Sequence, residues 1–315
     1  MKIPNLGCSI QGRYKIIVLS KGIIVEERPW ANNMILNQGK NLIMSGANSI
    51  TAVTSYCAVG TGSATVLATD VGLTAEATAV RTNTYLTGTG NCGTSYVGQT
   101  QTNRRTYDFA VEVSNQNYSE LGWSPSSTKT TNLFSKTLIS GGTVTVLAGQ
   151  QLRVVYDLQL VITPTGVQVG NLTVAGWGAV AGTYFYQTTY LFDSIQPSGT
   201  AMGLIGFFEP FQTSICCQAY NGTPSFSSMW GSLVGVSPIA SLLNGSWSTY
   251  VTNSFSRTAV FPYWSAASWS STAVRMFSYG PSSLGYNQFA FIFTSPQTKL
   301  NTYRLRPNGY TISIT

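Results

Sequence analysis

The feature that most constrains the fold is a run of alternating apolar and polar residues at 150–162, QQLRVVYDLQLVI. Every even position from Leu152 to Ile162 is apolar. A period of two residues predicts a β-strand, and at ~3.3 Å per residue such a strand exceeds about 30 Å. The odd-numbered residues form the opposite face of this strand, and they are neither all charged nor all apolar. We therefore expect a neighbour from the same chain or from another chain to cover that face. The candidate subunit-contact residues are Arg153, Val155, Asp157 and Val161.

The polar part of this sequence carries little charge. Only 9% of the residues are charged, against about 25% in ordinary soluble proteins. Hydroxyl and amide groups cost less to desolvate than ions, so this composition favours an extracellular, virion or fibre protein over a cytosolic enzyme. The net charge is +7, but the basic residues are scattered, with no basic stripe interleaved with aromatics. We therefore expect a mildly basic surface and no nucleic-acid partner.

The residue inventory argues against several kinds of chemistry. Histidine is absent, which removes the commonest general base and metal ligand. The five cysteines form no metal-binding pattern, and the adjacent Cys216 and Cys217 are expected to be reduced and buried. Reduced thiols, no apolar leader and no run of ~18 apolar residues predict synthesis in the cytoplasm and no membrane span.

The carboxylates offer one candidate pair, Asp108 and Glu112, which share a face of an alternating stretch at 106–113 that Asp157 could join. A glycosidase needs two such groups, but the alternation already explains both as the solvent side of a strand. Glycine-rich nucleotide motifs are also missing. We predict a non-enzymatic protein with no catalytic, cofactor-binding or metal site.

The local patterns predict an all-β protein. Residues 14–19 and 22–27 form a hairpin around Ser20 and Lys21, and 34–44 form one short helix after an N-cap at Asn32 or Asn33. Gly141 and Gly142 predict a tight hairpin turn between strands at 133–138 and 143–147. Further strands are predicted at 50–59, 106–113, 182–192, 214–219, 289–293 and 302–314.

This pattern leads to a specific architecture. We predict an antiparallel, jelly-roll-like β-sandwich with one short N-terminal helix and a loop-rich insertion. The core spans 1–165, the aromatic insertion spans 166–286, and 287–315 supply strands that return to the core.

Aromatic residues crowd the predicted insertion. Rings on loops can stack on sugars or anchor an interface. We expect most of these rings to fill the core of a region poor in aliphatic residues and a few to be exposed. The segment FPYWSAASW is the best candidate for exposed rings. Its candidate glycan or partner contacts are Phe261, Tyr263, Trp264 and Trp269.

Several segments resemble structural proteins from the tail modules of tailed bacteriophages. They are NMILNQGKNLIMSG at 33–46, YCAVGTG at 56–62, ATDVGLTAE at 68–76, YDFAVEVSNQNYSELGWS at 107–124, TVLAGQQLRVVYDLQL at 145–160 and SPQTKLNTYRLRPNGYTISIT at 295–315. The resemblance implies a helix before a strand that ends in a GTG turn, and an ELG turn after a long strand. The resemblance does not extend to the aromatic insertion, and the resembling segments contain no catalytic motif.

The resemblance implies a tail, collar or adaptor protein of a virion, made in the host cytoplasm, that holds neighbouring subunits and presents loops. Expected partners are further copies of the chain and other tail proteins. A trimer is favoured, with a sixfold or twelvefold ring as the alternative. The alternative function is a receptor-binding adhesin that recognises host surface glycans through the insertion aromatics.

Overall fold

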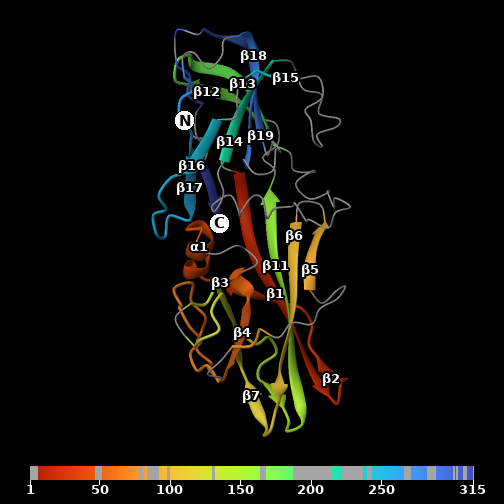
Figure 1. Cartoon of the computed structure of the whole chain (residues 1–315). Coiled ribbons are helices and arrows are strands. Elements are labelled where there is room, and N and C mark those ends of the chain that lie inside the picture. Colours follow the sequence, from red (N-terminus) through yellow and green to blue (C-terminus); the bar gives the residue numbers. More distant parts are fainter. Residues whose placement is uncertain are drawn as a thin grey trace. The chain divides into compact units, whose positions relative to one another are not determined.

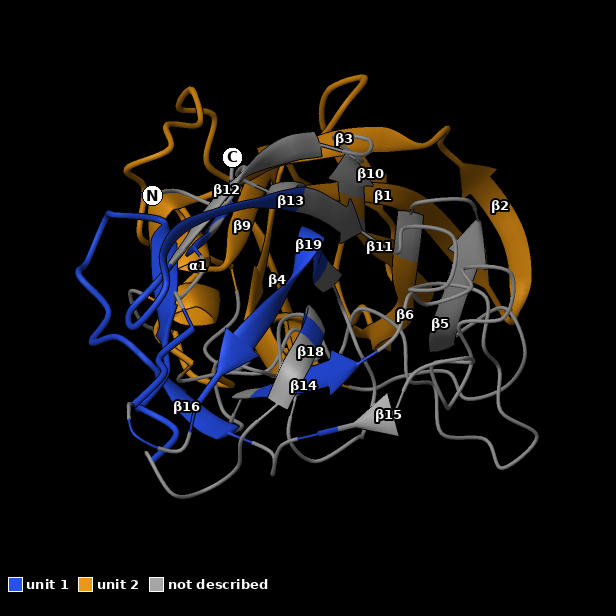
Figure 2. Ribbon diagram, turned by 90° about the horizontal axis from the view of Figure 1, so that it is seen from above, with its two compact units in different colours: residues 1–8, 162–315 blue, residues 9–161 orange. Residues whose placement is uncertain are grey.

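The structure is a computed structural model of the chain. It describes residues 6–46, 52–77, 81–83, 92–97, 100–129, 132–163, 168–186, 215–221, 237–239, 243–265, 271–281, 289–300, 302, 304–307 and 311–314. These residues form two compact units (Figure 2). Unit 2 comprises Ser9–Val161, and unit 1 comprises Met1–Cys8 with Ile162–Thr315.

Unit 2 contains the described helices and the first half of the strands (Figure 1). The helices are α1 (Asn37–Met44) and the short 3₁₀ helix η1 (Ala52–Thr54). The strands are β1 (Leu6–Ser20), β2 (Ile23–Glu27), β3 (Ala31–Ile35), β4 (Tyr56–Gly60), β5 (Cys92–Val97), β6 (Thr100–Val111), β7 (Gln116–Tyr118), β8 (Glu120–Ser124), β9 (Ser135–Leu138), β10 (Val144–Val146) and β11 (Gln150–Thr163).

Two antiparallel layers enclose the core of unit 2. In one layer, β6 pairs with β5 and β11, and β1 pairs with β2 and β3. In the other layer, β8 lies between β4 and β9, and β9 also pairs with β3. Trp123 of β8 stacks on Tyr156 of β11 with ring centroids 4.1 Å apart. The two sheets therefore meet through large aromatic side chains from opposite strands.

The predicted long strand is confirmed as β11. Leu152, Val154, Tyr156 and Leu158 are all buried on its even face. The all-β prediction with one short helix is also confirmed among the described residues. All described strand pairs are antiparallel except β1 with β20, which is parallel.

The predicted N-terminal hairpin exists, but its turn lies one residue later. Ser20 pairs with Ile23, so the turn consists of Lys21 and Gly22 instead of Ser20 and Lys21. Both turn residues have positive φ, 50° and 82°. Tight hairpin turns of this kind require positive φ, and glycine adopts it without steric cost.

The helix begins later than predicted, because the residues before it form β3. This strand pairs with β1 through Ala31, Asn32 and Asn33, and with β9 through Met34 and Ile35. Neither Asn32 nor Asn33 is therefore an N-cap, and Leu36 precedes α1 without a side-chain cap. Hydrogen bonding to two strands outweighs the weak helical pattern of 34–36.

The turn at Gly141 and Gly142 does not join a hairpin, so that prediction is wrong. Both glycines have positive φ, 81° and 86°. However, β9 pairs with β3 and β8, whereas β10 pairs with β7. The turn redirects the chain from one sheet to another, which local sequence alone does not reveal.

Unit 1 is built on a second antiparallel sheet. Its strands are β12 (Gln168–Val174), β13 (Gly178–Tyr186), β14 (Ile215–Asn221), β15 (Ser237–Pro238), β16 (Leu243–Trp247), β17 (Ser256–Val260), β18 (Ser271–Pro281), β19 (Phe289–Lys299) and β20 (Thr311–Ile314). β13 pairs with β12 and β19, and β18 pairs with β19 and β14. The region predicted as a loop-rich insertion thus contains β12 to β18. The predicted boundaries at residues 165 and 286 stay a prediction.

Aromatic side chains fill the described core of unit 1. Phe277 contacts Phe293 with ring centroids 5.1 Å apart, and Trp177 lies 5.8 Å from Phe277. Cys217 is buried and reduced, as predicted. The side chain of Cys216 lies outside the described residues.

Gly39 provides a test of how α1 packs. A Cβ at this position would lie 2.1 Å from the backbone oxygen of Phe134, which also accepts the N–H of Leu36 at 3.1 Å. Gly39→Ala should therefore destabilise the protein by about 1–3 kcal/mol, although alanine favours a helix by about 1 kcal/mol. Urea denaturation measures the difference. Val113→Ala, at a side chain that is 94% exposed, is the control and should change stability by less than about 0.5 kcal/mol. A Gly39→Ala protein as stable as the unmodified chain would show that α1 can move away from Phe134.

Candidate binding face on the long strand

The odd face of β11 is covered in part by side chains of the same chain. Val155 is buried in a cluster with Ile17 and Leu19 of β1, and Trp30 packs against this cluster. Trp30 follows β2 and precedes β3. The sequence left open whether the cover comes from this chain or another one, and for Val155 it comes from this chain.

Asp157 lies at the centre of this face and is fully buried. Its Oδ2 accepts hydrogen bonds from Nε and Nη2 of Arg13 at 3.0 and 2.7 Å. Arg104 of β6, directly opposite in the register, donates from Nε to Oδ1 at 2.6 Å and from Nη2 to Oδ2 at 2.7 Å. The hydrogen bonds to Asp157 raise the pKa of Arg104. A buried carboxylate needs such partners, because an unpaired charge in the interior is costly.

Trp30 lies against the cations of this site. The Cζ atoms of Arg13 and Arg104 are 4.6 and 5.1 Å from its ring centroid, and Nζ of Lys15 is 5.8 Å away. These distances are within the range of cation–π attraction. We call Arg13, Lys15, Trp30, Arg104 and Asp157 the Trp30 cluster.

Further cross-strand pairs continue along the same face. Arg153 donates to both carboxylate oxygens of Asp108 at 2.6 and 2.9 Å, and Gln159 donates to the hydroxyl of Thr102 at 3.2 Å. Asp108 is thus not simply the solvent side of a strand, because its partner is Arg153. Val161 is half-buried. The register-fixing hydrogen bonds expected of Arg153 and Asp157 exist within the chain, while their role in a subunit contact stays a prediction.

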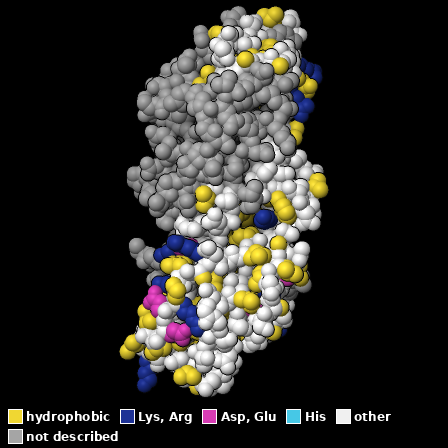
Figure 3. Space-filling view, turned by 180° about the vertical axis from the view of Figure 1, so that it is seen from behind, with side chains coloured by type: hydrophobic (Ala, Val, Ile, Leu, Met, Phe, Trp, Pro, Cys, Tyr) yellow, Lys and Arg dark blue, Asp and Glu magenta, His cyan; other side chains and the backbone are white. Residues whose placement is uncertain are grey.

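Figure 3 shows acidic and basic side chains lying next to one another on one face, with uncharged atoms around them. Lys15 pairs with Glu27 at 2.7 Å, and Arg28 pairs with Glu26 at 2.8 Å. These acidic residues therefore lie beside basic partners, although the basic residues are scattered along the sequence.

The motif residues of the tail-protein resemblance meet at Glu120. This buried carboxylate accepts backbone N–H groups of Gly62 at 3.1 Å, Thr74 at 3.0 Å and Ala75 at 2.7 Å. Nζ of Lys136 lies 3.6 Å from its Oε2. A Cβ on Gly62 would lie 2.4 Å from Oε1 of Glu120. The GTG and ELG segments therefore hold a loop in place, which is an architectural role.

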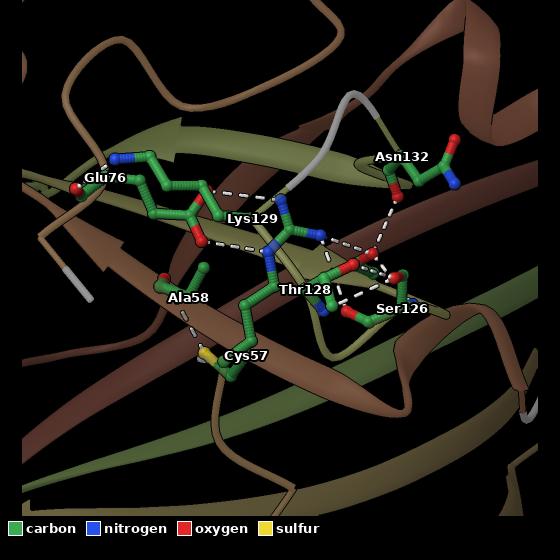
Figure 4. Close-up of polar contacts among 9 residues, drawn as sticks. Cys57, Ala58, Glu76, Ser126, Thr128, Lys129 and Asn132 are labelled. Atoms are coloured by element: carbon green, nitrogen blue, oxygen red, sulfur yellow. Dashed lines mark hydrogen bonds and ion pairs between the residues drawn. The ribbon is translucent and has the colours of Figure 1, made fainter. Parts of the chain in front are cut away.

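A second buried network holds neighbouring loops (Figure 4). Arg81 donates to both carboxylate oxygens of Glu76 at 3.0 and 3.2 Å and to the hydroxyl of Ser124 at 2.7 Å. Lys129 donates to the backbone oxygen of Glu76 at 2.9 Å. Burial raises the pKa of the nearby Cys57 thiol, which makes this cysteine a poor nucleophile.

The aromatic candidates in unit 1 are mostly interior. Phe261 and Trp264 are 1% and 3% exposed, so the expectation that they are exposed is wrong. The backbone of Trp264 pairs with Leu305, which turns its ring onto Phe277 at 5.5 Å. Tyr263 is 48% exposed, and Cζ of Arg306 lies 5.5 Å from its ring centroid. Trp269 lies outside the described residues.

Sequence reasoning missed Arg13 and Trp30. Sequence reasoning also gave Arg104 no role. The pattern at 102–108 does place Arg104 and Asp108 on one strand face, and this pattern could have suggested ionic pairing with β11. Nothing local to Trp30 signals its position, because it follows Pro29 in a short connection.

The described residues show neither a metal-binding cluster nor a membrane-spanning helix. No group of three or more cysteine, aspartate or glutamate side chains there is placed to hold a metal ion. No described helix is long and apolar enough to cross a membrane.

No protein-family model matches the chain, and no curated protein or solved structure matches it either.

The Glu120 network gives a stability prediction. Glu120→Gln keeps the shape of the side chain but removes the charge that attracts three N–H groups and Lys136, so we expect a loss of about 1–3 kcal/mol in unfolding free energy. The control is Glu27→Gln, whose carboxylate is 44% exposed and should cost less than about 1 kcal/mol. Urea denaturation at neutral pH compares the two, and equal midpoints would rule out a structural role for the Glu120 charge.

Proposed function

We propose that this chain is a non-enzymatic structural protein of a tailed-phage virion, a tail, collar or adaptor component. The observation that best supports the proposal is the Glu120 network. Residues from three of the resembling segments, 56–62, 68–76 and 107–124, converge there on one loop-holding contact. Motifs with this role suit a protein whose task is to keep a rigid shape.

The use of the acidic residues supports a non-enzymatic role. Eight of the ten acidic residues of the sequence lie in the described part of the chain. Each of the eight accepts a hydrogen bond or forms an ion pair with the chain itself. These partners account for the positions of the eight carboxylates, so no substrate is needed to explain them.

Exposed apolar side chains on β2, the second strand of the N-terminal hairpin, support assembly with further copies of the chain or with other tail proteins. Ile23, Ile24 and Val25 are 70%, 53% and 52% exposed, whereas Ile16 to Leu19 of β1 are buried. Consecutive residues of a strand point to opposite faces, so β2 presents apolar side chains on both. Apolar residues on both faces of the hairpin predict that both faces are buried, one of them by a partner. In the proposed oligomer a partner covers the exposed side chains of β2.

Light scattering with a charge substitution tests this assembly. We expect a mass well above the 33.8 kDa of the chain, with a trimer favoured over a sixfold or twelvefold ring. Ile24→Lys should shift the protein toward the monomer, because a charge in an apolar contact is costly. Val251→Lys is the matched control, since Val251 is 67% exposed in unit 1. A monomer for the unmodified chain, or equal effects of both substitutions, would contradict the proposal.

A receptor-binding adhesin is the second candidate, and one observation favours it. Tyr263 presents an exposed ring beside the guanidinium of Arg306, and this combination suits stacking on a sugar of a host surface glycan.

A glycan array tests the adhesin. Tyr263→Ala should abolish specific binding, and Tyr263→Phe should retain most of it because the ring remains. Absence of binding by the unmodified protein, or binding unchanged in Tyr263→Ala, would exclude Tyr263 as a glycan contact.

A further inference from the structure

The two arginines of the Trp30 cluster leave one positive charge without a balancing carboxylate among the described residues. Arg13 and Arg104 share the single carboxylate of Asp157, so two positive charges face one negative charge. Lys15 has its own partner, Glu27. A site with this balance attracts an anion at short range.

The two guanidiniums also retain hydrogen-bond donors. Each has five N–H donors, and each uses Nε and Nη2 on Asp157. Among the described residues, no acceptor contacts Nη1 of Arg13 or of Arg104. Each of these two nitrogens therefore presents two N–H groups from the same face of the sheet.

Solvent reaches this site although its centre is buried. The side chains of Arg13 and Arg104 are 36% and 33% exposed, whereas Asp157 is 0% exposed. Hydrogen bonds to Asp157 and contacts with the Trp30 ring hold both guanidinium groups in place. A site whose donors are already ordered loses less conformational entropy when it binds a ligand.

Three other arginines of unit 2, Arg28, Arg81 and Arg153, lack this combination. Arg81 is 1% exposed and is enclosed by Glu76 and Ser124. Arg28 uses Nε, Nη1 and Nη2 on Glu26 and on backbone oxygens of 140–143. Arg153 has a carboxylate of its own in Asp108. Arg13 and Arg104 thus differ from Arg81 and Arg28 in accessible donors, and from Arg153 in charge balance.

We propose that the Trp30 cluster binds an oxyanion, the carboxylate or phosphate group of an acidic saccharide or of a free ion. The oxyanion accepts N–H groups from Nη1 of Arg13 and Arg104 and balances the second positive charge. Guanidinium groups suit carboxylate and phosphate oxygens because their N–H groups are planar and fixed. This inference does not depend on the proposed virion function.

Isothermal titration calorimetry on the full chain tests the site, with inorganic phosphate, glucuronate, an oligomer of glucuronic acid and glucose as separate ligands. We expect the three anions to bind with an affinity that falls as salt rises, and glucose not to bind. Tighter binding of the oligomer than of glucuronate at equal carboxylate concentration identifies a saccharide ligand. Equal affinities for the oligomer and for glucuronate would identify a site for free ions.

Arg13→Gln is the decisive variant, because Arg104 still holds Asp157 through two hydrogen bonds. It should weaken anion binding about tenfold or more. Arg153→Gln removes the same charge from the same sheet face outside the cluster and should change the affinity less than about threefold. Arg13→Lys replaces this variant if Arg13→Gln does not fold. It keeps the positive charge but loses the planar set of guanidinium N–H donors, so it should also weaken anion binding.

Thermal unfolding of each variant establishes that it is folded under the titration conditions. Anion binding lost in the Arg13 variants and retained in Arg153→Gln supports the proposal. Heats no larger than those of glucose, or equal losses in Arg13→Gln and Arg153→Gln, would overturn it and show that the cluster only joins strands.

Discussion

The register between β11 and β6 is the constraint on which the rest of unit 2 depends. In this register Tyr156 points into the core and stacks on Trp123, while Asp157, one residue later, points outward and lies opposite Arg104. Because side chains alternate between faces, a slip of one residue would place the carboxylate in the aromatic core and the tyrosine outside. The core and the ionic face therefore enforce the same register.

Ions are scarce in this chain, and most described acidic residues bind its own groups. A buried charge is costly unless partners replace its hydration. Glu120 gains three backbone N–H groups, and Glu76 gains Arg81. These closed networks hold loops on the scaffold. The Trp30 cluster also joins arginines to a buried carboxylate, but its arginines keep exposed N–H donors. This difference distinguishes the proposed binding site from the purely structural contacts.

Sequence reasoning performed well where one pattern dominated and poorly where two patterns competed. The long strand at 150–162 was predicted because both its length and its alternation point the same way. At 31–36 a weak helical pattern competed with strand pairing, and pairing with β1 and β9 prevailed. Gly141 and Gly142 correctly indicated a turn, but a turn does not specify which strands will pair.

The sequence by itself determined the all-β class, the position of β11 and the presence of Arg153 and Asp157 on its outer face. These features follow from alternation, which is a property of neighbouring residues. Only the tertiary structure decided that Trp30 and Arg13 join that face, that Phe261 and Trp264 are interior, and that Glu120 holds the loop at Thr74. Such contacts join residues far apart in the chain, and their partners are chosen by sheet pairing and by the need to satisfy buried polar groups.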